Sequence, residues 1–315
     1  MMDNVSQITM FFLSGLNETN NHRFTLFFLT LLCYCVILLF NISVIVTIIM
    51  GKNLHEPMYI LLSHFCMNLL YGTAGFFPKF LWDLLSPVQV ISYSGCLVQV
   101  QVIASFGFSE VSILSVMAYD RYVAICRPLE YHSVMSKRRL IVLVCYSWMT
   151  PFCIAGIHVF LTSRLKLCGQ YIAKIYCMNW MIVDLACFPA ETAVSTIVVY
   201  ISIIFYFFHV LFIVLSYMYL IKICANSIEN RAKLMQTCVP HLTSLLIFLV
   251  NVLSEVMFMR FGSKDLSQAF KNFVAIEYLV IPPLLNPLIY VNVLFPFLRF
   301  RIAESYAWFD ICCYF

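Results

Sequence analysis

The stretch that decides the fold reads Met117-Ala118-Tyr119-Asp120-Arg121-Tyr122-Val123-Ala124-Ile125-Cys126-Arg127-Pro128-Leu129. An acid, a base and an aromatic residue stand side by side at the end of a long apolar run, where a membrane-spanning helix would meet the cytoplasm. Charge is costly in that setting, so such residues usually carry a function. The alternative is a simple anchor, in which Arg121 extends its head group to the interface. We interpret Asp120 and Arg121 as a latch, in which Arg121 pairs with Asp120 or a neighbouring inner segment and is released to meet a partner.

The composition is that of an integral membrane protein. Of the 315 residues, 63% are hydrophobic and 11% are charged, with a mean hydropathy of +0.92, whereas soluble domains are about half apolar and about a quarter charged. The net charge of +4 is not gathered in a basic tract with interleaved aromatic residues, which excludes a nucleic-acid partner. Residues 1–21 lack the basic and apolar regions of a signal peptide, so the first span is expected to direct insertion.

Seven apolar windows are long enough to cross about 30 Å of hydrocarbon as helices. They lie at residues 24–50, 57–80, 96–120, 139–163, 192–222, 234–259 and 272–295. We therefore predict an all-α membrane protein with an N-terminal segment (1–23), a seven-helix transmembrane bundle (24–295) and a short cytoplasmic tail (296–315).

The basic residues predict the orientation, because cytoplasmic loops carry an excess of Lys and Arg. Of the 19 Lys and Arg residues, 11 follow spans one, three, five and seven, and eight belong to the other side. The N-terminus is therefore expected outside, where the sequons at Asn4 and Asn17 are acceptors for glycosylation. A third match, at Asn41, lies inside span one and is disregarded. The apolar end of the tail, residues 308–315, has two interpretations: palmitoylation at Cys312 or Cys313, or a disrupted reading frame.

Most of the 14 cysteines fall within the apolar spans or at their inner ends and are expected to be packing residues. Cys96, Cys168, Cys177 and Cys187 lie between spans on the outer side, where an oxidising compartment favours disulfides over free thiols. Four cysteines allow three pairings, which the residues alone leave open. The longest outer connection, residues 164–191, carries three of them and is expected to cover the mouth of the bundle.

The stretch from Met117 to Leu129 resembles the signature of vertebrate odorant receptors, a branch of the rhodopsin-like G-protein-coupled receptors. Further matching stretches follow in the family's order: Leu54-His55-Glu56-Pro57-Met58-Tyr59, Glu110 with Ser115-Val116, Ser216-Tyr217, Lys233 with Thr237-Cys238-Val239-Pro240-His241-Leu242, and Pro282-Pro283-Leu284-Leu285-Asn286-Pro287-Leu288-Ile289-Tyr290. Tyr71-Gly72-Thr73-Ala74-Gly75 is more similar to the fish members. The resemblance covers residues 24–292.

This resemblance implies a multi-pass plasma-membrane receptor that is surrounded by membrane lipid, needs no cofactor and catalyses nothing. It binds a small odorant and activates a stimulatory, olfactory-type heterotrimeric G protein. A receptor for an internal metabolite is the milder alternative. An ion channel or transporter with Glu110 and Glu277 as an acidic path is the rival, but repeated halves are not visible. The sequence shows no nucleophile with a base, phosphate-binding loop or metal-ligand spacing, and His64, His158, His209 and His241 are expected to be polar packing groups.

The resemblance also implies roles for single residues. It pairs Cys96 with Cys177 and Cys168 with Cys187. Its inner switch comprises Asp120, Arg121, Tyr122, Tyr217, Asn286, Pro287 and Tyr290. Proline in the last helix frees a backbone carbonyl and loosens the inner end, which lets Tyr290 swing toward Tyr217 and Arg121 in the active state.

The odorant pocket is expected between the outer halves of spans three, five, six and seven. Helical spacing and the resemblance give its lining as Ile103, Ala104, Gly107, Phe108, Ser202, Phe205, Val252, Val256, Ile276 and Leu279, with ordinary helix packing as the alternative for each. Arg260 is read either as a clamp for a carboxylate-bearing odorant or as an interfacial residue paired with Glu277 or Glu255.

Glu110 lies deep in span three, about three helical turns outward of Arg121. In the family, the matching acid faces an aspartate of span two in a sodium-accessible pocket. Here that position is Leu69, with Asn68 beside it. A sodium site at Glu110 and Asn68, and a protonated, hydrogen-bonded Glu110, are the two interpretations.

Overall fold

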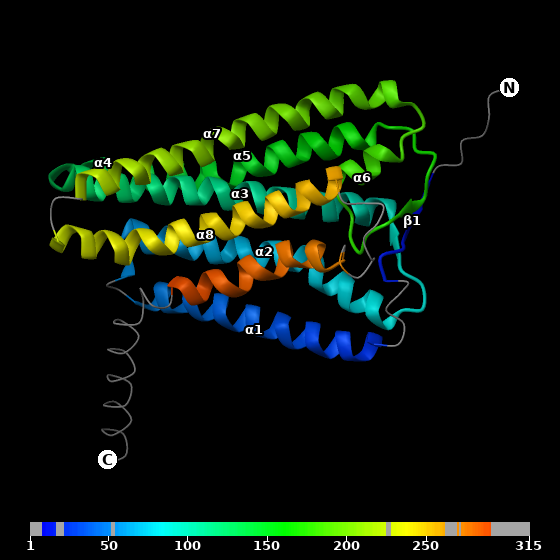
Figure 1. Ribbon diagram of the computed structural model, residues 1–315, viewed down its shortest axis with the longest axis horizontal. Helices are drawn as coiled ribbons and strands as arrows, with labels where there is room; N and C mark the ends of the chain where they lie inside the picture. The colour runs from blue at the N-terminus through cyan, green and yellow to red at the C-terminus, as the bar shows by residue number, and fades with distance from the viewer. Residues whose placement is uncertain are drawn as a thin grey trace, which may run out of the picture.

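The computed structural model describes residues 8–16, 22–51, 54–224, 228–261, 270 and 272–290. Within these residues, seven long helices run side by side as one bundle (Figure 1). They are α1 (Arg23–Met50), α2 (Pro57–Leu85), α3 (Tyr93–Cys126), α5 (Lys137–Ser163), α7 (Ala193–Cys224), α8 (Ile228–Phe261) and the unlabelled helix Asn272–Tyr290. The predicted all-α bundle is confirmed.

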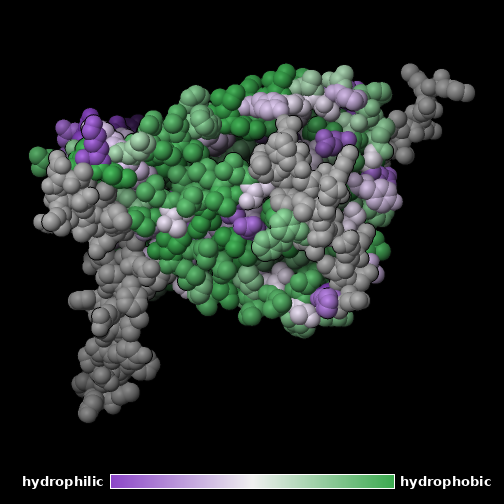
Figure 2. Space-filling view, viewed as in Figure 1, coloured by the Kyte–Doolittle hydropathy of each residue, from purple (hydrophilic) through white to green (hydrophobic). Residues whose placement is uncertain are grey.

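The surface of the bundle matches a bilayer. Among the described residues, six of the helices are long and apolar enough to cross a membrane, and α8 contributes the shorter apolar stretch Cys238–Ser254. Figure 2 shows hydrophobic residues over the middle of the bundle and hydrophilic residues gathered at the end where α4 lies. Most of the hydrophilic residues visible on this face in Figure 2 lie toward the ends, as expected of a membrane-spanning protein.

Helix α3 is the centre of the bundle. Its apolar window is 78% buried, against 17% for the window of α7. Gly72 lets α2 approach α3 closely, because a Cβ at this position would collide with the ring of Phe106. The stretch that opened the sequence analysis thus ends the most enclosed helix.

Most helices extend beyond their predicted windows, and α2 and α3 show why. Helix α2 continues from the predicted residue 80 to Leu85, because Lys79 and Asp83 are spaced i, i+4 and pair with each other. Helix α3 begins at Tyr93, where Ser92 Oγ accepts a hydrogen bond of 3.1 Å from the Gly95 amide. The hydropathy windows marked the hydrocarbon section and missed the polar ends of these helices.

A small three-stranded sheet closes the end opposite α4 (Figure 1). Strand β1 (Met10–Leu13) lies between β2 (Val90–Ser92), to which it is antiparallel, and β3 (Tyr171–Ile172), to which it is parallel. Phe11 and Leu13 are buried in a second hydrophobic core beneath the sheet. The sequence analysis predicted no strand in the N-terminal segment, so this element is a correction.

Short elements complete the connections. The long connection also holds α6 (Asn179–Asp184) and the 3-10 turn η4 (Pro189–Thr192), while η3 (Pro128–Glu130) and α4 (Tyr131–Val134) follow α3 at the other end. Asn4, Asn17 and the tail 296–315 lie outside the described residues, so the predictions made for them stay predictions.

Candidate functional site

Both oxygens of the Asp120 carboxylate are engaged. Arg121 donates through Nε to Asp120 Oδ2 at 3.0 Å, and the hydroxyl of Tyr131 donates to Oδ1 at 2.8 Å. Asp120 is fully buried, which makes the pairing necessary. Burial, together with the adjacent Asp120 carboxylate, raises the pKa of Tyr131 above its ordinary value, so this hydroxyl remains a donor at neutral pH. The arrangement is a closed latch with three members, and sequence reasoning had missed Tyr131.

Two tyrosines of the predicted switch meet on one histidine. The ring centroid of His241 lies 5.4 Å from Tyr290, edge to face, and 6.5 Å from Tyr217. Ser244 Oγ donates to Tyr290 Oη at 3.4 Å. His241 thus contacts both tyrosines of the predicted switch, a position that the simple packing expected of it did not specify. Its place in the family-like stretch Thr237–Leu242 was the available signal.

The helical hydrogen bond that Pro287 cannot make is replaced by one from α1. Pro287 has no N–H, so the carbonyl of Pro283 lacks its helical donor. Asn41 supplies one, since its side-chain amide donates to the Pro283 oxygen at 2.9 Å and to the Ile37 oxygen at 2.9 Å. The chain stays helical from 272 to 290. The predicted free carbonyl is therefore held by α1.

Glu110 sits in a polar layer near the middle of α3. The amide of Asn286 donates to Glu110 Oε1 at 3.4 Å, and both residues are fully buried. Glu110 Oε2, Asn286 Oδ1 and Asn68 Oδ1 are buried acceptors without a hydrogen-bond partner among the described residues. Oxygens of this kind suit a hard cation, but a single carboxylate supplies the only charge, because Leu69 replaces the second acid.

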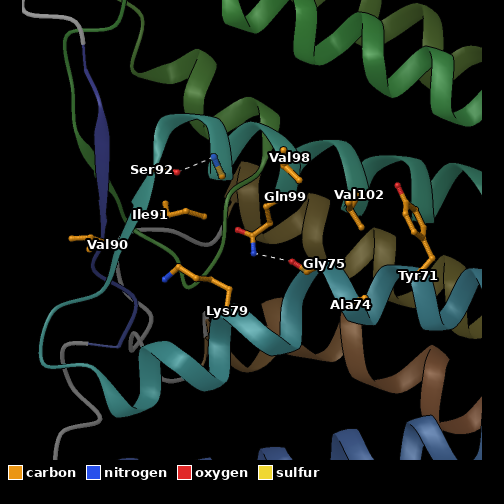
Figure 3. A pocket seen from close by; sticks show the side chains of 11 residues that line it. Tyr71, Ala74, Gly75, Lys79, Val90, Ile91, Ser92, Val98, Gln99 and Val102 are labelled. Atoms are coloured by element: carbon orange, nitrogen blue, oxygen red, sulfur yellow. Dashed lines mark hydrogen bonds between the residues drawn. The ribbon is translucent and has the colours of Figure 1, made fainter.

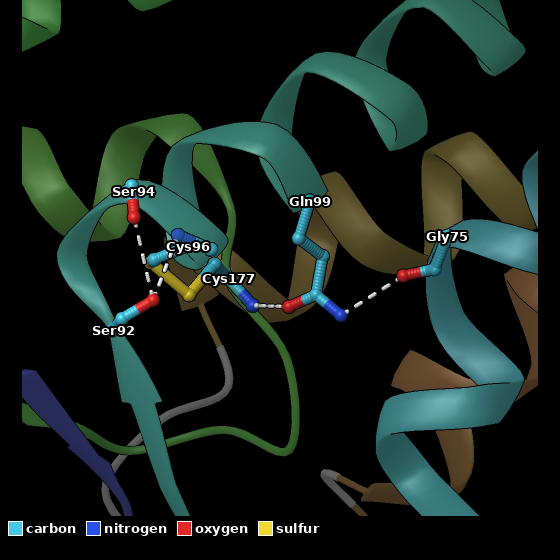
Figure 4. Close-up of a disulfide and its surroundings, with 7 residues drawn as sticks. Gly75, Ser92, Ser94, Cys96, Gln99 and Cys177 are labelled. Atoms are coloured by element: carbon cyan, nitrogen blue, oxygen red, sulfur yellow. Dashed lines mark hydrogen bonds between the residues drawn. A yellow bond between two sulfur atoms is a disulfide. The ribbon is translucent and has the colours of Figure 1, made fainter.

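The loop that covers the sheet end of the bundle is fastened to α3 by one disulfide and one glutamine, and a second disulfide closes the loop on itself. Cys96 is bonded to Cys177 and Cys168 to Cys187, the pairs that the resemblance implies. As Figure 4 shows, Gln99 accepts from the Cys177 amide at 2.8 Å and donates to the Gly75 carbonyl at 3.0 Å. This one side chain links the loop, α3 and α2.

A hollow of about 500 Å³ adjoins this glutamine. It lies between α2, α3 and β2 and is lined by Lys79, Ser92 and Gln99 among mostly apolar neighbours (Figure 3). Lys79 is paired with Asp83, and both halves of the Gln99 amide are bonded. The polar side chains that line this hollow therefore already have hydrogen-bond or ion-pair partners within the protein.

Four side chains of α3, α5 and α7 form an aromatic and polar cluster. The ring of Phe108 stacks on Tyr206 with centroids 4.4 Å apart and meets His158 edge to face at 6.0 Å. His158 Nε2 and Ser202 Oγ are 3.0 Å apart and share a hydrogen bond. The predicted pocket residues Phe108 and Ser202 are thus brought together, along with Tyr206 and His158, which sequence reasoning had not assigned to the pocket.

The sequence profile of the olfactory receptor family matches residues 30–293. The chain belongs to this family. Human olfactory receptor 4M1 is 35% identical over 295 residues, which are 91% of either chain. The mouse olfactory receptors 4B13 and 5B21 are 35% and 34% identical and cover 92% and 98% of this chain, and 93% and 94% of their own. The predicted family is confirmed; olfactory receptors are not enzymes, and the channel or transporter reading is not favoured.

The other predicted pocket residues of this olfactory receptor lie in three settings. Ile103 and Leu279 are buried in the core, and Ala104, Val252 and Ile276 are half-buried. Gly107 makes room for the Tyr278 hydroxyl, with which a Cβ would collide, so its visible role is helix packing. Phe205 is 37% exposed and lies on the side of α7 that faces away from the bundle, whereas Tyr206 is buried and faces into it. The side chains of Val256, Arg260 and Glu255 lie outside the described residues.

Proposed function

We propose that this olfactory receptor binds a small odorant in the outer half of its helix bundle and activates a stimulatory, olfactory-type heterotrimeric G protein at the inner end. The observation that carries the proposal is the buried latch of Asp120, Arg121 and Tyr131, which lies at the end of α3 opposite the disulfide-tied loop. A buried ion pair with a third hydrogen-bonded member has two discrete arrangements, closed and released. A ligand can bias an element of this kind.

The odorant site is built around Phe108, Tyr206, His158 and Ser202. Small-molecule sites are mostly apolar, with a few polar groups that fix orientation. Here the stacked rings of Phe108 and Tyr206 supply apolar area, and the His158–Ser202 pair supplies the polar contact. The site favours an odorant with an apolar body and one hydrogen-bonding group.

Activation separates contacts that the structure holds closed. Arg121 leaves Asp120 and Tyr131, and Tyr217 and Tyr290 leave His241 to meet Arg121. The odorant supplies the free energy by binding the open arrangement more tightly, and such coupling typically amounts to about 1–3 kcal/mol. The crevice that opens between α3, α7 and the helix 272–290 receives the G protein.

The receptor is oriented with the β1 end outside the cell. Two disulfides at that end need an oxidising compartment, and Lys137, Arg138 and Arg139 lie at the opposite end, as expected for the cytoplasm. Residues 1–23 are accordingly extracellular, with glycosylation at Asn4 and Asn17, residues 24–295 span the plasma membrane in contact with lipid, and residues 296–315 form the cytoplasmic tail. Nucleic acid is not a partner.

The decisive experiment is a cyclic-AMP assay in cells that express the receptor, challenged with pools of odorants. The wild-type receptor is expected to respond to at least one pool, and Arg121→Ala is expected to abolish that response at equal surface expression. An undiminished response of Arg121→Ala would refute the switch assignment. Arg260→Ala tests the remaining clamp hypothesis, which fails if responses to acidic odorants are unchanged.

A further inference from the structure

A second hollow, of about 580 Å³, lies on the lipid-facing side of the bundle between α3, α5 and α7. Its walls include Val142 and Tyr146 of α5 and Phe208 and Phe212 of α7, and Ser115 of α3 also lines it. Val142 and Phe208 are each 60% exposed, so the hollow is open toward the bilayer. It is therefore a groove on the membrane surface, and it adjoins the odorant cluster through Phe205, whose ring meets Tyr206 edge to face at 5.2 Å.

The groove carries polar groups at two levels along α5. At its outer end the Tyr146 hydroxyl and His209 Nε2 are 2.7 Å apart and share a hydrogen bond, with their rings stacked. At its inner end Arg139 lines the mouth. Arg139 and Tyr146 are seven residues apart on α5, so the groove is about 10 Å long and runs along the helix axis. This is the direction in which an acyl chain lies in a bilayer.

The mouth carries positive charge that no ion pair among the described residues neutralises. Lys137, Arg138 and Arg139 form the first turn of α5, and all three are exposed. None of the three ion pairs among the described residues involves them. A neutral sterol would leave this charge unmatched, whereas the headgroup of an anionic lipid complements it while its chain fills the apolar walls.

We propose that this groove binds one acyl chain of an anionic phospholipid of the inner leaflet, with the phosphate of the headgroup at Arg139. The assignment to the inner leaflet rests on the proposed orientation, but the binding site itself does not. Residues Ser115 and Tyr119, which also line the groove, stand on α3 just before the latch.

Native mass spectrometry of the purified, detergent-solubilised receptor tests the proposal independently of orientation and of signalling. Phosphatidylserine and phosphatidylcholine with identical chains are added in equal amounts. The wild-type receptor is expected to retain phosphatidylserine preferentially. Arg139→Gln is expected to reduce bound phosphatidylserine about fivefold, the change typical of one basic residue near an anionic surface.

Two variants serve as controls. Arg139→Lys keeps the charge and should retain binding. Arg164→Gln removes a positive charge just beyond the outer end of α5, where Arg164 stacks on Phe160, and should also retain it. Equal losses from Arg139→Gln and Arg164→Gln, or equal retention of the two lipids, would overturn the proposal.

A photoreactive phosphatidylserine with a diazirine in the middle of its chain locates the bound lipid. Labelling is expected on peptides that contain Val142 to Tyr146 and Phe208 to Phe212. Labels found only on other helices would reject the site. Labelling of the groove by a sterol probe at equal efficiency would reject the proposed preference for an anionic lipid.

Discussion

The side-chain amide of Asn41 donates a 2.9 Å hydrogen bond to the carbonyl of Pro283, the carbonyl that Pro287 deprives of its helical donor. Residues 242 positions apart in the sequence thereby join α1 to the last helix at a carbonyl that lacks its helical donor. The bond lets a proline-containing helix stay regular while the switch is closed.

Asn41→Leu should lower the thermal stability of the receptor. The substitution leaves the Pro283 carbonyl buried and without this donor, at a cost of about 1–3 kcal/mol. Thermal unfolding of the purified receptor measures the loss. Ser43→Ala, an exposed polar position on the same helix, is the control and should change stability by less than about 0.5 kcal/mol. Equal melting temperatures for the two variants would show that the Asn41 bond contributes nothing.

Tyr131→Phe should raise signalling in the absence of odorant. It removes the hydrogen bond to Asp120 and leaves the Arg121 pair to hold the latch alone. Hydrogen bonds to charged groups contribute about 1.5–3 kcal/mol, and each 1.4 kcal/mol shifts an equilibrium about tenfold. Basal cyclic AMP at matched surface expression is the readout. Tyr219→Phe, which removes an exposed hydroxyl of α7 outside the switch, is the control; a rise in both variants or in neither contradicts the latch.

Gln99→Leu should weaken the attachment of the outer loop. It removes the bond to the Gly75 carbonyl and leaves the buried Cys177 amide without its acceptor, and a buried unpaired group costs about 1–3 kcal/mol. We expect a lower melting temperature and a weaker odorant response. Gln99→Glu keeps the acceptor for Cys177 and should fall between Gln99→Leu and the wild type. A melting temperature and odorant response of Gln99→Glu below those of Gln99→Leu would argue against the pair of hydrogen bonds that Gln99 makes.

The two disulfides should differ in their contribution to stability. Cys96 and Cys177 are separated by 81 positions, Cys168 and Cys187 by 19. Loop-closure entropy makes the longer link more stabilising by about 1 kcal/mol. Cys96→Ser should therefore reduce the folded fraction at the cell surface more than Cys168→Ser does. The reverse order, measured by surface staining against total protein, contradicts this ranking.

Glu110→Gln should leave the receptor stable and should not change its response to sodium. Glutamine keeps an oxygen to accept from Asn286, and Leu69 removes the second carboxylate that a sodium ion would use. The test compares melting temperatures in sodium and choline chloride. If sodium raises the melting temperature of the wild-type receptor and not that of Glu110→Gln, a sodium ion binds at Glu110 and our expectation is wrong.

The bundle was predictable because a membrane span is a local property: about 20 consecutive apolar residues identify it. The inner stretch around Asp120 and Arg121 was equally visible, since charge at a membrane edge is rare. These features need no knowledge of which segments meet.

What sequence reasoning missed depends on distant contacts or on helix rotation. Strand β1 pairs with residues 90–92 and 171–172, far from it in the sequence. Asn41 was dismissed as a sequon inside a span, and its partner is 242 residues away. Helix α7 is apolar around much of its circumference, so no amphipathic pattern fixed its rotation, and Phe205 was chosen where Tyr206 points inward.

The most direct measurement is guanine-nucleotide exchange by a purified stimulatory G protein mixed with the purified receptor and an odorant identified in the cell assay. The wild-type receptor should accelerate exchange only when the odorant is present. Arg121→Ala should bind the same odorant and fail to accelerate exchange. Full acceleration by Arg121→Ala would contradict the claim that the latch at Asp120 and Arg121 carries the signal.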